Sequence, residues 1–407
     1  MNRVEKLIRE LCPNGVEYKM LGDIAVIDRG NGMPKTMLTK KGVGAIHYGE
    51  IYTHYGPTAR ETVSFVTPED AAKLTVVQPG DVVITNTSEN LDDVCSTVAW
   101  LGENAIVIGG HSSVIRSPLD PTFLAYWFRS TNFFAQKYKL ATGAKVIDIS
   151  ANKLKKVVIP VPPIEVQREI VKILDLFTEF EAELEAELEA RRKQYEHYRD
   201  QLLTFPENGA ATWVELDSLV EYINGKAHEK LVHPDGSVPL ITARFISRNG
   251  EANRWLKPEV VLTPALQGDV ALVLSDLPNG RALARTFFVR ESNAFAINQR
   301  VAILRVKDPT KLLPRFLSFV MDRNRQLLRY DNGTDQTHLK KTAVQKVLLP
   351  VPPIEVQRQI ADVLDKFDAL VNDLSSGLPA EIEVRRKQYE YYRDKLLTFK
   401  ELQPEAA

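Results

Sequence analysis

The sequence has few cysteines, no long apolar run and almost no net charge. Only Cys12 and Cys95 occur among 407 residues, far apart and without a CxxC pair. We therefore expect no disulfide framework, and we expect two idle thiols in a reducing cytoplasm. No stretch approaches the length of a membrane span, and the polar N-terminal segment lacks the apolar core of a signal peptide. These absences predict a cytoplasmic protein.

The motifs of common catalytic sites are also missing. The sequence has no GxxxxGK[ST] phosphate loop, no HExxH and no Asn/Asp-Pro-Pro-aromatic adenine-methylation motif. GVGAIH (42–47) contains Gly-x-Gly without a third glycine at the dinucleotide spacing, which favours a simple turn. The seven histidines show no metal-ligand spacing. We therefore expect a non-catalytic chain that holds no cofactor and no metal.

A long internal duplication dominates the sequence. PVPPIEVQR occurs at 160–168 and again at 350–358, and RRKQYEHYRDQLLTF (191–205) is matched by RRKQYEYYRDKLLTF (385–399) with two differences. The period is far too long for a solenoid, so it indicates two domains, each followed by its own arm. We divide the chain into a first domain (1–160), a first arm (161–205), a second domain (206–350), a second arm (351–399) and a tail (400–407).

Charge is distributed unevenly over these segments. The two domains sum to +7 and the segments that follow them to −8, although the whole chain carries −1. A neutral protein can thus present basic faces locally, as nucleic-acid binding requires.

The arms have the pattern of long helices. Each follows a tandem proline, and apolar residues then recur at alternating spacings of three and four. The first arm predicts an uninterrupted helix of about 40 residues, whereas SSGLP (375–379) should interrupt the second. The glutamates of EAELEAELEA (181–190) suit a solvated face. Because the first arm leaves one domain and arrives at the other, we expect the arms to pair antiparallel and the C-terminus to return near the N-terminus.

The two domains share apolar positions but differ in their polar residues. VVQPGDVVIT (76–85) matches ALQGDVALVL (265–274), and FLAYWFRS (123–130) matches FLSFVMDR (316–323). Short strands with a few helices predict a mixed α/β (α+β) fold. A common scaffold with different loops suits the binding of two different ligands.

On these residues the chain resembles the specificity subunit of type I restriction–modification systems. The match is carried by PxPPIEVQR and RRKQYxYYRDxLLTF in the arms, and EAELEAELEA resembles the spacer repeat of the IC branch. The resemblance implies two target-recognition domains spaced by two antiparallel coiled-coil helices in a pseudo-twofold circular arrangement. It also implies a bipartite double-stranded DNA target with an unread spacer, and a bacterial or archaeal host.

The resemblance further implies partners. Two methyltransferase subunits and, in the full complex, restriction/translocase subunits would bind S-adenosylmethionine, ATP and Mg²⁺. Two other hypotheses stay open: a coiled-coil scaffold without DNA reading, and a fused nuclease or methyltransferase, which the missing motifs disfavour.

Candidate DNA-binding residues are polar side chains on loops, because base edges are read by such groups. For each one, a solvated or capping role is the alternative. In the first domain we select Lys35, Thr36, Tyr55, Arg60, Asn86, Ser88, His111, Ser112 and Lys145. In the second we select Lys226, His228, Arg244, Arg248, Asn279, Arg281, Gln299, Arg300, Gln336 and His338. Lys40, Lys41, Lys340 and Lys341 are expected to contact phosphates.

The repeated arm block carries two tyrosines one helical turn apart. They are Tyr195 and Tyr198 in the first arm, and Tyr389 and Tyr392 in the second. One interpretation is coiled-coil packing. The other is docking of identical methyltransferase subunits, since identical partners need identical faces.

Overall fold

The computed structural model describes residues 3–143, 145–206, 209, 211–277, 282–372 and 377–402. The chain divides into two compact units, in which unit 1 comprises residues 1–183 and 383–407 and unit 2 comprises 184–382. Each unit therefore combines one domain with portions of both arms.

Unit 1 is built on a five-stranded sheet, β2-β11-β7-β9-β4, and a four-stranded sheet, β5-β3-β10-β6. Two short pairs, β1-β13 and β12-β8, complete it. The strands are β1 (Tyr18–Met20), β2 (Val26–Arg29), β3 (Val43–Ile46), β4 (Thr58–Ala59), β5 (Ser64–Val66), β6 (Thr75–Val77), β7 (Val82–Thr85), β8 (Thr87–Ser88), β9 (Thr97–Trp100), β10 (Ile106–Ile108), β11 (Ser112–Arg116), β12 (Ile147–Asp148) and β13 (Val158–Pro160). The helices are α1 (Arg3–Leu11), α2 (Leu21–Ile24), η1 (Lys35–Met37), α3 (Tyr48–Thr53), α4 (Pro68–Ala71), α5 (Pro121–Trp127), α6 (Thr131–Leu140) and α7 (Ala151–Leu154).

Unit 2 repeats this plan with a four-stranded sheet, β15-β22-β18-β20, and a three-stranded sheet, β17-β16-β21. The short pairs are β14-β24 and β19-β23. The strands are β14 (Thr212–Glu215), β15 (Val220–Asn224), β16 (Val238–Ile241), β17 (Trp255–Leu256), β18 (Val270–Val273), β19 (Ser275–Asp276), β20 (Thr286–Phe288), β21 (Ala296–Ile297), β22 (Val301–Val306), β23 (Thr337–His338) and β24 (Leu348–Val351). The helices are α9 (Leu216–Leu219), η2 (Glu229–Leu231), α10 (Ala243–Ser247), η3 (Pro258–Val260), α11 (Pro314–Met321), α12 (Arg325–Leu328) and α13 (Lys341–Gln345). Even the one parallel pair of each smaller sheet is duplicated, as β3-β10 and β16-β21.

The arms form the long helices that their apolar spacing predicts. The first is one 39-residue helix, α8 (Ile164–Leu202), and the second is divided into α14 (Ile354–Asn372) and α15 (Leu378–Leu396). Pro379 lies in the first turn of α15, where the missing N–H of proline costs no hydrogen bond. Of the predicted break at 375–379, residues 375 and 376 lie outside the described part of the chain.

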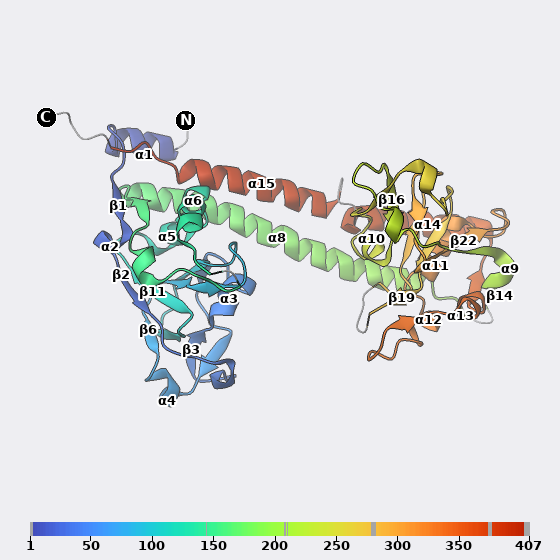
Figure 1. Ribbon diagram of the computed structural model, residues 1–407, viewed down its shortest axis with the longest axis horizontal. Helices are drawn as coiled ribbons and strands as arrows, with labels where there is room; N and C mark the ends of the chain where they lie inside the picture. The colour runs from blue at the N-terminus through green and yellow to red at the C-terminus, as the bar shows by residue number, and fades with distance from the viewer. Residues whose placement is uncertain are drawn as a thin grey trace. The chain divides into compact units, whose positions relative to one another are not determined.

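The two arms pair antiparallel, as predicted. In unit 1, α8 and α15 run side by side, with Phe177 stacked on Tyr392 at 5.5 Å and Glu181 ion-paired with Arg386 at 2.9 Å (Figure 1). In unit 2 the corresponding residues exchange arms, since Phe367 of α14 stacks on Tyr198 of α8 at 5.6 Å. The same aromatic contact is therefore made once in each unit, as the duplication of the sequence leads one to expect.

The beginning of each arm belongs to the core of its unit. Val166, Ile170 and Leu174 of α8 are buried among the core residues of unit 1, and Ile360 and Leu364 of α14 are buried in unit 2. The apolar stripe that suggested a coiled coil thus has two uses, packing against the domain first and against the other arm further along. A helix that completes a core needs no separate partner there.

A buried glutamine in each copy of PVPPIEVQR attaches the arm to its domain. Gln167 is 3% exposed, its Oε1 accepts from the backbone N–H of Asp120 at 2.8 Å, and its Nε2 donates to the carbonyl of Pro162 at 2.7 Å. Gln357 makes the same two bonds to Leu313 and Pro352 at 2.8 Å each. Each copy of PVPPIEVQR therefore fixes the start of an arm helix to a loop of its domain.

Replacing Gln167 by Met should lower the free energy of unfolding of unit 1 by about 2–4 kcal/mol, because one partly buried N–H and one buried carbonyl lose their partners. Urea unfolding followed by circular dichroism measures the effect. Gln201→Met, at an exposed position of the same helix, is the control and should change stability by less than about 0.5 kcal/mol. Equal stability of the two variants would contradict the role of Gln167.

The two ends of the described chain meet in unit 1. The backbone N–H of Val16 donates to the carbonyl of Lys400 at 2.8 Å, and that of Leu402 donates to the carbonyl of Val16 at 2.9 Å. Leu397 and Phe399 are buried in the core of the same unit. The prediction that the C-terminal segment returns to the N-terminal one is confirmed.

Candidate nucleic-acid interface

In unit 1 several candidate residues lie where the strands of the larger sheet end. Thr85, the last residue of β7, is paired with Ser112, the first residue of β11, so the turn at 109–111 and the short strand β8 lie at one edge. There β8 pairs with β12, with Ser88 opposite Ile147. This register brings His111 and the segment containing Lys145 to one surface, which we call the strand-end face of unit 1, while the side chains of Thr87 and Ser88 at the same place are buried.

The side chains on this face contact one another. The hydroxyl of Thr87 lies 2.8 Å from Nδ1 of His111, and the ring of His111 lies 4.8 Å from that of Tyr48. Nε of Arg29 donates to the carbonyl of Gly110 at 2.9 Å, and its guanidinium lies 3.7 Å from the carboxylate of Asp148. Hydroxyl, imidazole, phenol and guanidinium groups are thus held together, a set suited to base edges and phosphates.

Unit 2 has the same face with different residues. Val273 at the end of β18 is paired with Val301 at the start of β22, and β19 pairs with β23 through Ser275 and His338. Nε2 of Gln336 donates to the hydroxyl of Ser275 at 3.1 Å. The candidates that this register gathers are Lys226, Gln299, Arg300, Gln336 and His338.

Glu229 organises one side of that face. Its carboxylate accepts from Nδ2 of Asn298 at 2.9 Å and from Nε2 of Gln299 at 3.1 Å, and these hydrogen bonds lower the pKa of Glu229. Lys226 pairs with Asn298 through a backbone bridge. Gln299 is therefore oriented through one hydrogen of its amide, while Arg300 beside it is exposed.

For four candidates, Asn86, Ser88, Ser112 and His228, the expectation of a free side chain on a loop is wrong. Asn86 is fully buried, donating to the carbonyl of Ile149 at 2.8 Å and accepting from the hydroxyl of Ser113 at 2.8 Å. Ser112 is also fully buried. His228 is buried between the carbonyl of Lys226, 2.8 Å from Nδ1, and the N–H of Leu262, which donates to Nε2 at 2.9 Å. These side chains are buried and do not lie on the strand-end faces. Ser88, 6% exposed, is nearly as enclosed.

The comparisons with known proteins agree with this arrangement. The family model "Type I restriction modification DNA specificity domain" matches residues 13–191 and again residues 211–384. The chain belongs to this family. It contains two specificity domains, one centred on each unit, so the resemblance inferred from the arms is confirmed.

Relatives extend over most of the chain. It is 33% identical over 267 residues to the Escherichia coli "Type I restriction enzyme EcoR124I/EcoR124II specificity subunit", covering 62% of this chain and 65% of that subunit, less than two thirds of its length. The fold is similar to that of the type I S subunit from M. genitalium, with a TM-score of 0.55, 14% identity, and 94% and 96% of the two chains covered. A chain solved in a study of complex assembly and conformational transition of the type I R-M system gives a TM-score of 0.63 at 19% identity, covering 95% and 98%. The relatives are named specificity subunits, in agreement with a non-catalytic role.

Other candidates of the first specificity domain lie away from its strand-end face. Lys40 and Lys41 precede β3, at the opposite end of that strand from Tyr48. The hydroxyl of Tyr55 accepts from the N–H of Val63 at 2.9 Å, and Arg60 reaches the carbonyl of Leu101 at 3.5 Å. Thr36 lies with Lys35 in η1, and the charge of Lys35 adds to the effect of burial in lowering the pKa of His47.

In the second specificity domain the remaining candidates are spread more widely. Arg244 and Arg248 are exposed on and just after α10, where Arg248 ion-pairs with Glu251 at 3.6 Å. Lys340 and Lys341 follow β23 directly, with the ammonium of Lys341 5.3 Å from the ring centre of Tyr222. Asn279 and Arg281 lie outside the described residues.

Sequence reasoning missed Arg29 and Tyr48. Arg29 ends β2 and Tyr48 begins α3, directly after β3, so both lie at strand ends that the duplicated pattern could have identified. Their place on the face depends on which strand ends meet at one edge of the sheet, and the polarity of a single loop does not indicate this.

The arm tyrosines divide into two kinds. Tyr195 and Tyr389 pack against the cores of their units, and burial raises the pKa of both. Tyr198 and Tyr392 are 39% and 41% exposed beside the stacked phenylalanines. The packing interpretation therefore holds for both pairs, since Tyr198 and Tyr392 stack on the phenylalanines of the other arm. Of the four tyrosines, only these two are also substantially exposed, together with Tyr391, which is 61% exposed.

No group of three or more His, Cys, Asp or Glu side chains capable of holding a metal occurs among the described residues. Within the same part of the chain, no helix has the length and apolar character needed to cross a membrane.

Acid should destabilise the second specificity domain through His228. Burial lowers the pKa of this imidazole, although the Lys226 carbonyl and Glu229 partly oppose the effect. In the unfolded chain His228 titrates near 6.5, so below that pH the unfolded state gains a proton that the folded state resists, and stability falls. We expect the Tm to drop from pH 7.5 to 5.5, and the drop to be about 2–4 °C smaller in His228→Gln. The control is His338→Gln, at an exposed position of the same unit, which should leave the drop unchanged.

Proposed function

We propose that this chain is the DNA-reading subunit of a type I restriction–modification complex, in which each specificity domain reads one half of a bipartite target. The observation that carries the proposal is the repetition of one scaffold with different side chains on the same face. Arg29, His111 and Tyr48 occupy that face in unit 1, and Gln336, His338 and Arg300 occupy it in unit 2. Equivalent frames with different polar groups suit the reading of two different sequences.

The face has the chemistry that base reading needs. Arginine recognises guanine through two hydrogen bonds, and glutamine recognises adenine in the same way. Arg29 and Lys145 in unit 1, and Lys226, Arg300 and Lys340 in unit 2, supply positive charge for the phosphates. Asp148 ion-pairs with Arg29, and Glu229 accepts a hydrogen bond from the amide of Gln299.

Substitutions on one face should affect one half-site. Arg300→Ala is expected to weaken binding to the cognate duplex about 10- to 100-fold and to relax one position in the half read by the second domain. Lys340→Ala should instead weaken binding to all sequences alike and reduce the slope of log affinity against log salt by about 1. Binding of the assembled complex to duplexes mutated position by position measures both effects.

The control for this experiment is Arg325→Ala, on an arginine of unit 2 whose side chain is 91% exposed and pairs with Asp200 of the arm. It should leave affinity and sequence preference unchanged. An equal loss of discrimination in both half-sites after Arg300→Ala would contradict the assignment of one half-site to each domain.

The arms are proposed to dock two methyltransferase subunits, one at each copy of the arm block, and through them the restriction subunits. Tyr198 and Tyr392 offer the duplicated exposed surface that two identical partners require. S-adenosylmethionine, ATP and Mg²⁺ then belong to these partners. The second candidate, a scaffold that does not read DNA, predicts no salt-dependent binding to duplex DNA, and the same measurement separates the two.

A further inference from the structure

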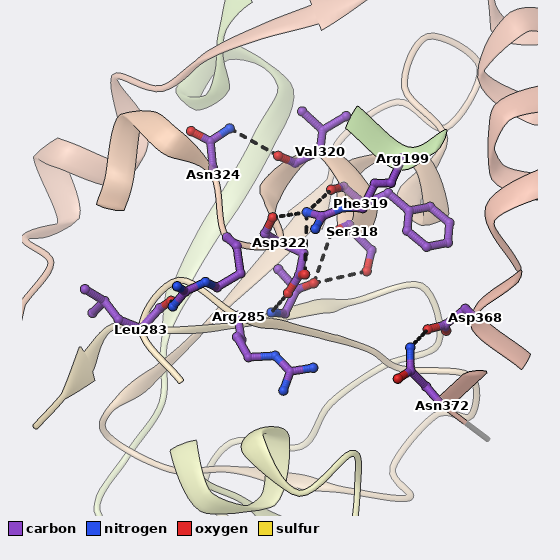
Figure 2. A network of polar contacts seen from close by, with 12 residues as sticks. Arg199, Leu283, Arg285, Ser318, Phe319, Val320, Asp322, Asn324, Asp368 and Asn372 are labelled. Carbon is purple, nitrogen blue, oxygen red and sulfur yellow. Dashed lines mark hydrogen bonds and ion pairs between the residues drawn. The ribbon is translucent and has the colours of Figure 1, made fainter. Parts of the chain in front are cut away.

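An arginine of the repeated arm block meets a different environment in each unit. In unit 2 it is Arg199 of α8, whose guanidinium points at the C-terminal end of α11 (Figure 2). It lies 3.5 Å from the carboxylate of Asp322 and donates to the carbonyls of Asp322 and Phe319. The carboxylate also accepts from the N–H of Thr286 at 2.9 Å. Asp322 therefore connects the sheet of the domain to the arm.

Unit 1 has the same framework. α5 takes the place of α11, and a threonine of the adjoining strand fixes each helix: the hydroxyl of Thr97 donates to the carbonyl of Ala125 at 3.1 Å, and that of Thr286 donates to the carbonyl of Ser318 at 3.0 Å. In the aligned segments 123–130 and 316–323, the residue at the place of Asp322 is Arg129. The arm residue equivalent to Arg199 is Arg393. Unit 1 thus sets an arginine where unit 2 has the carboxylate.

The guanidinium of Arg129 lacks hydrogen-bond partners for part of its N–H groups. One Nη donates to the carbonyl of Thr97 at 3.1 Å, but the buried Nε has no hydrogen-bond partner in the described structure. Burial lowers the pKa of Arg129, and the positive charge of Arg393 acts in the same direction, against Tyr389 and Tyr126. A buried guanidinium beside a second one is costly unless an anion accompanies them.

A cavity of about 350 Å³ opens at this place. Its lining includes Arg129, Arg393 and Lys137 together with the N-terminus of α6 at Ser130 and Thr131. The volume is that of a small ligand site, and backbone N–H groups at a helix start add to its positive potential.

Two acidic residues, Asp92 and Asp93, also line the cavity, and Asp394 lies beside Arg393. The carboxylate of Asp394 accepts from Nε of Arg393 and from the N–H of Thr131, both at 3.1 Å. Asp93 accepts from Asn90 at 2.7 Å, and Lys137 donates to the carbonyls of Asp92 and Val94 at 3.2 and 3.1 Å. Burial lowers the pKa of the Lys137 ammonium, and Cys95, Asp92 and Asp93 act in the opposite direction. None of these contacts reaches Arg129.

We propose that this cavity binds an oxyanion, a carboxylate or phosphate group, that joins Arg129 to Arg393 as Asp322 joins its domain to Arg199. The ligand completes the attachment of the second arm to the first specificity domain. The group comes either from a free ion or from an acidic side chain of a docked protein, since both present two or more oxygens to a guanidinium.

Inorganic phosphate is the probe, and thermal unfolding of the full chain is the measurement. At constant ionic strength, replacing 50 mM chloride by phosphate should raise the Tm by about 2–4 °C, because only the folded state binds the ion. Acetate should produce a smaller rise in the same direction. Assembly with the methyltransferase subunits distinguishes the sources: a partner carboxylate in the cavity abolishes the phosphate effect, and a free-ion site retains it.

Two variants decide whether Arg129 is the site. Arg129→Met removes the charge and should abolish the phosphate effect. Arg129→Asp recreates the arrangement of unit 2, so it should melt at or above Arg129→Met in chloride and also show no phosphate effect. Arg325→Met, the exposed arginine of unit 2, should respond to phosphate like the unmodified chain. An unmodified chain that melts alike in phosphate and chloride, or variants at Arg129 that keep the full effect, would overturn the proposal.

Discussion

Exchanging residues 1–160 for the first domain of another type I specificity subunit should change one half of the recognised sequence and leave the other half as it is. The reason is that each unit has its own sheets, its own core and its own strand-end face. Methylation mapping in cells that express the hybrid with its partner subunits gives the result directly. A change in both halves at once would mean that the two domains do not read independently.

The exchanged domain must still pack against the arms, so the control is a hybrid that keeps the contacts between them. The first domain meets the arms through Asp120 with Gln167, Tyr126 with Asp175 at 2.7 Å, and Thr131 with Asp394. A second hybrid that retains residues 120–132 of this chain preserves all three. If the second hybrid methylates DNA and the first does not, the first hybrid has lost the contacts between domain and arms. The half-site comparison is then made with the second hybrid.

Inserting one further EAEL after Leu188 should lengthen the unread spacer by one base pair and leave both half-site sequences unchanged. The two units divide within this repeat, at Glu183 and Leu184, and α8 is unbroken through it. Four residues add about 6 Å and rotate the helix by ~40° beyond a full turn. That rotation is close to the step of one base pair in B-DNA, which has roughly ten pairs to a turn.

The burial pattern supports an insertion of four residues rather than another number. Leu184 is 8% exposed and Leu188 partly buried one turn on, while Glu183, Glu185, Glu187 and Glu189 between and beside them are exposed. Adding four residues keeps the leucines on one side of the helix, whereas adding one alanine turns the following stripe by about 100°. The one-residue insertion is therefore expected to lose methylation, and the four-residue insertion to retain it. An unchanged spacer with full methylation after the EAEL insertion would contradict the ruler.

The sequence predicted the order of domains and arm helices because each of them occurs twice in the chain. The apolar spacing of the arms, their antiparallel pairing and the interruption near Pro379 all follow from periodicity and connectivity, which need no knowledge of packing. Because of the duplication, equivalent residues make equivalent contacts, as Phe177 with Tyr392 and Phe367 with Tyr198 do.

The site was harder to predict because it depends on which way single polar side chains point. Asn86 and His228 follow strands and look like loop residues, yet both turn inward and satisfy buried backbone groups. Gln167 and Gln357 look like surface residues at the start of amphipathic helices, but each binds a domain loop from within. Such choices are decided by tertiary hydrogen bonding, which periodicity does not encode.

Methylation mapping of the unmodified chain with its partner subunits tests the central claim most directly. We expect one bipartite sequence, with two specified parts separated by a spacer of fixed length in which every base occurs. Methylation at a single continuous sequence, or none that depends on this chain, would contradict the assignment of one half-site to each specificity domain.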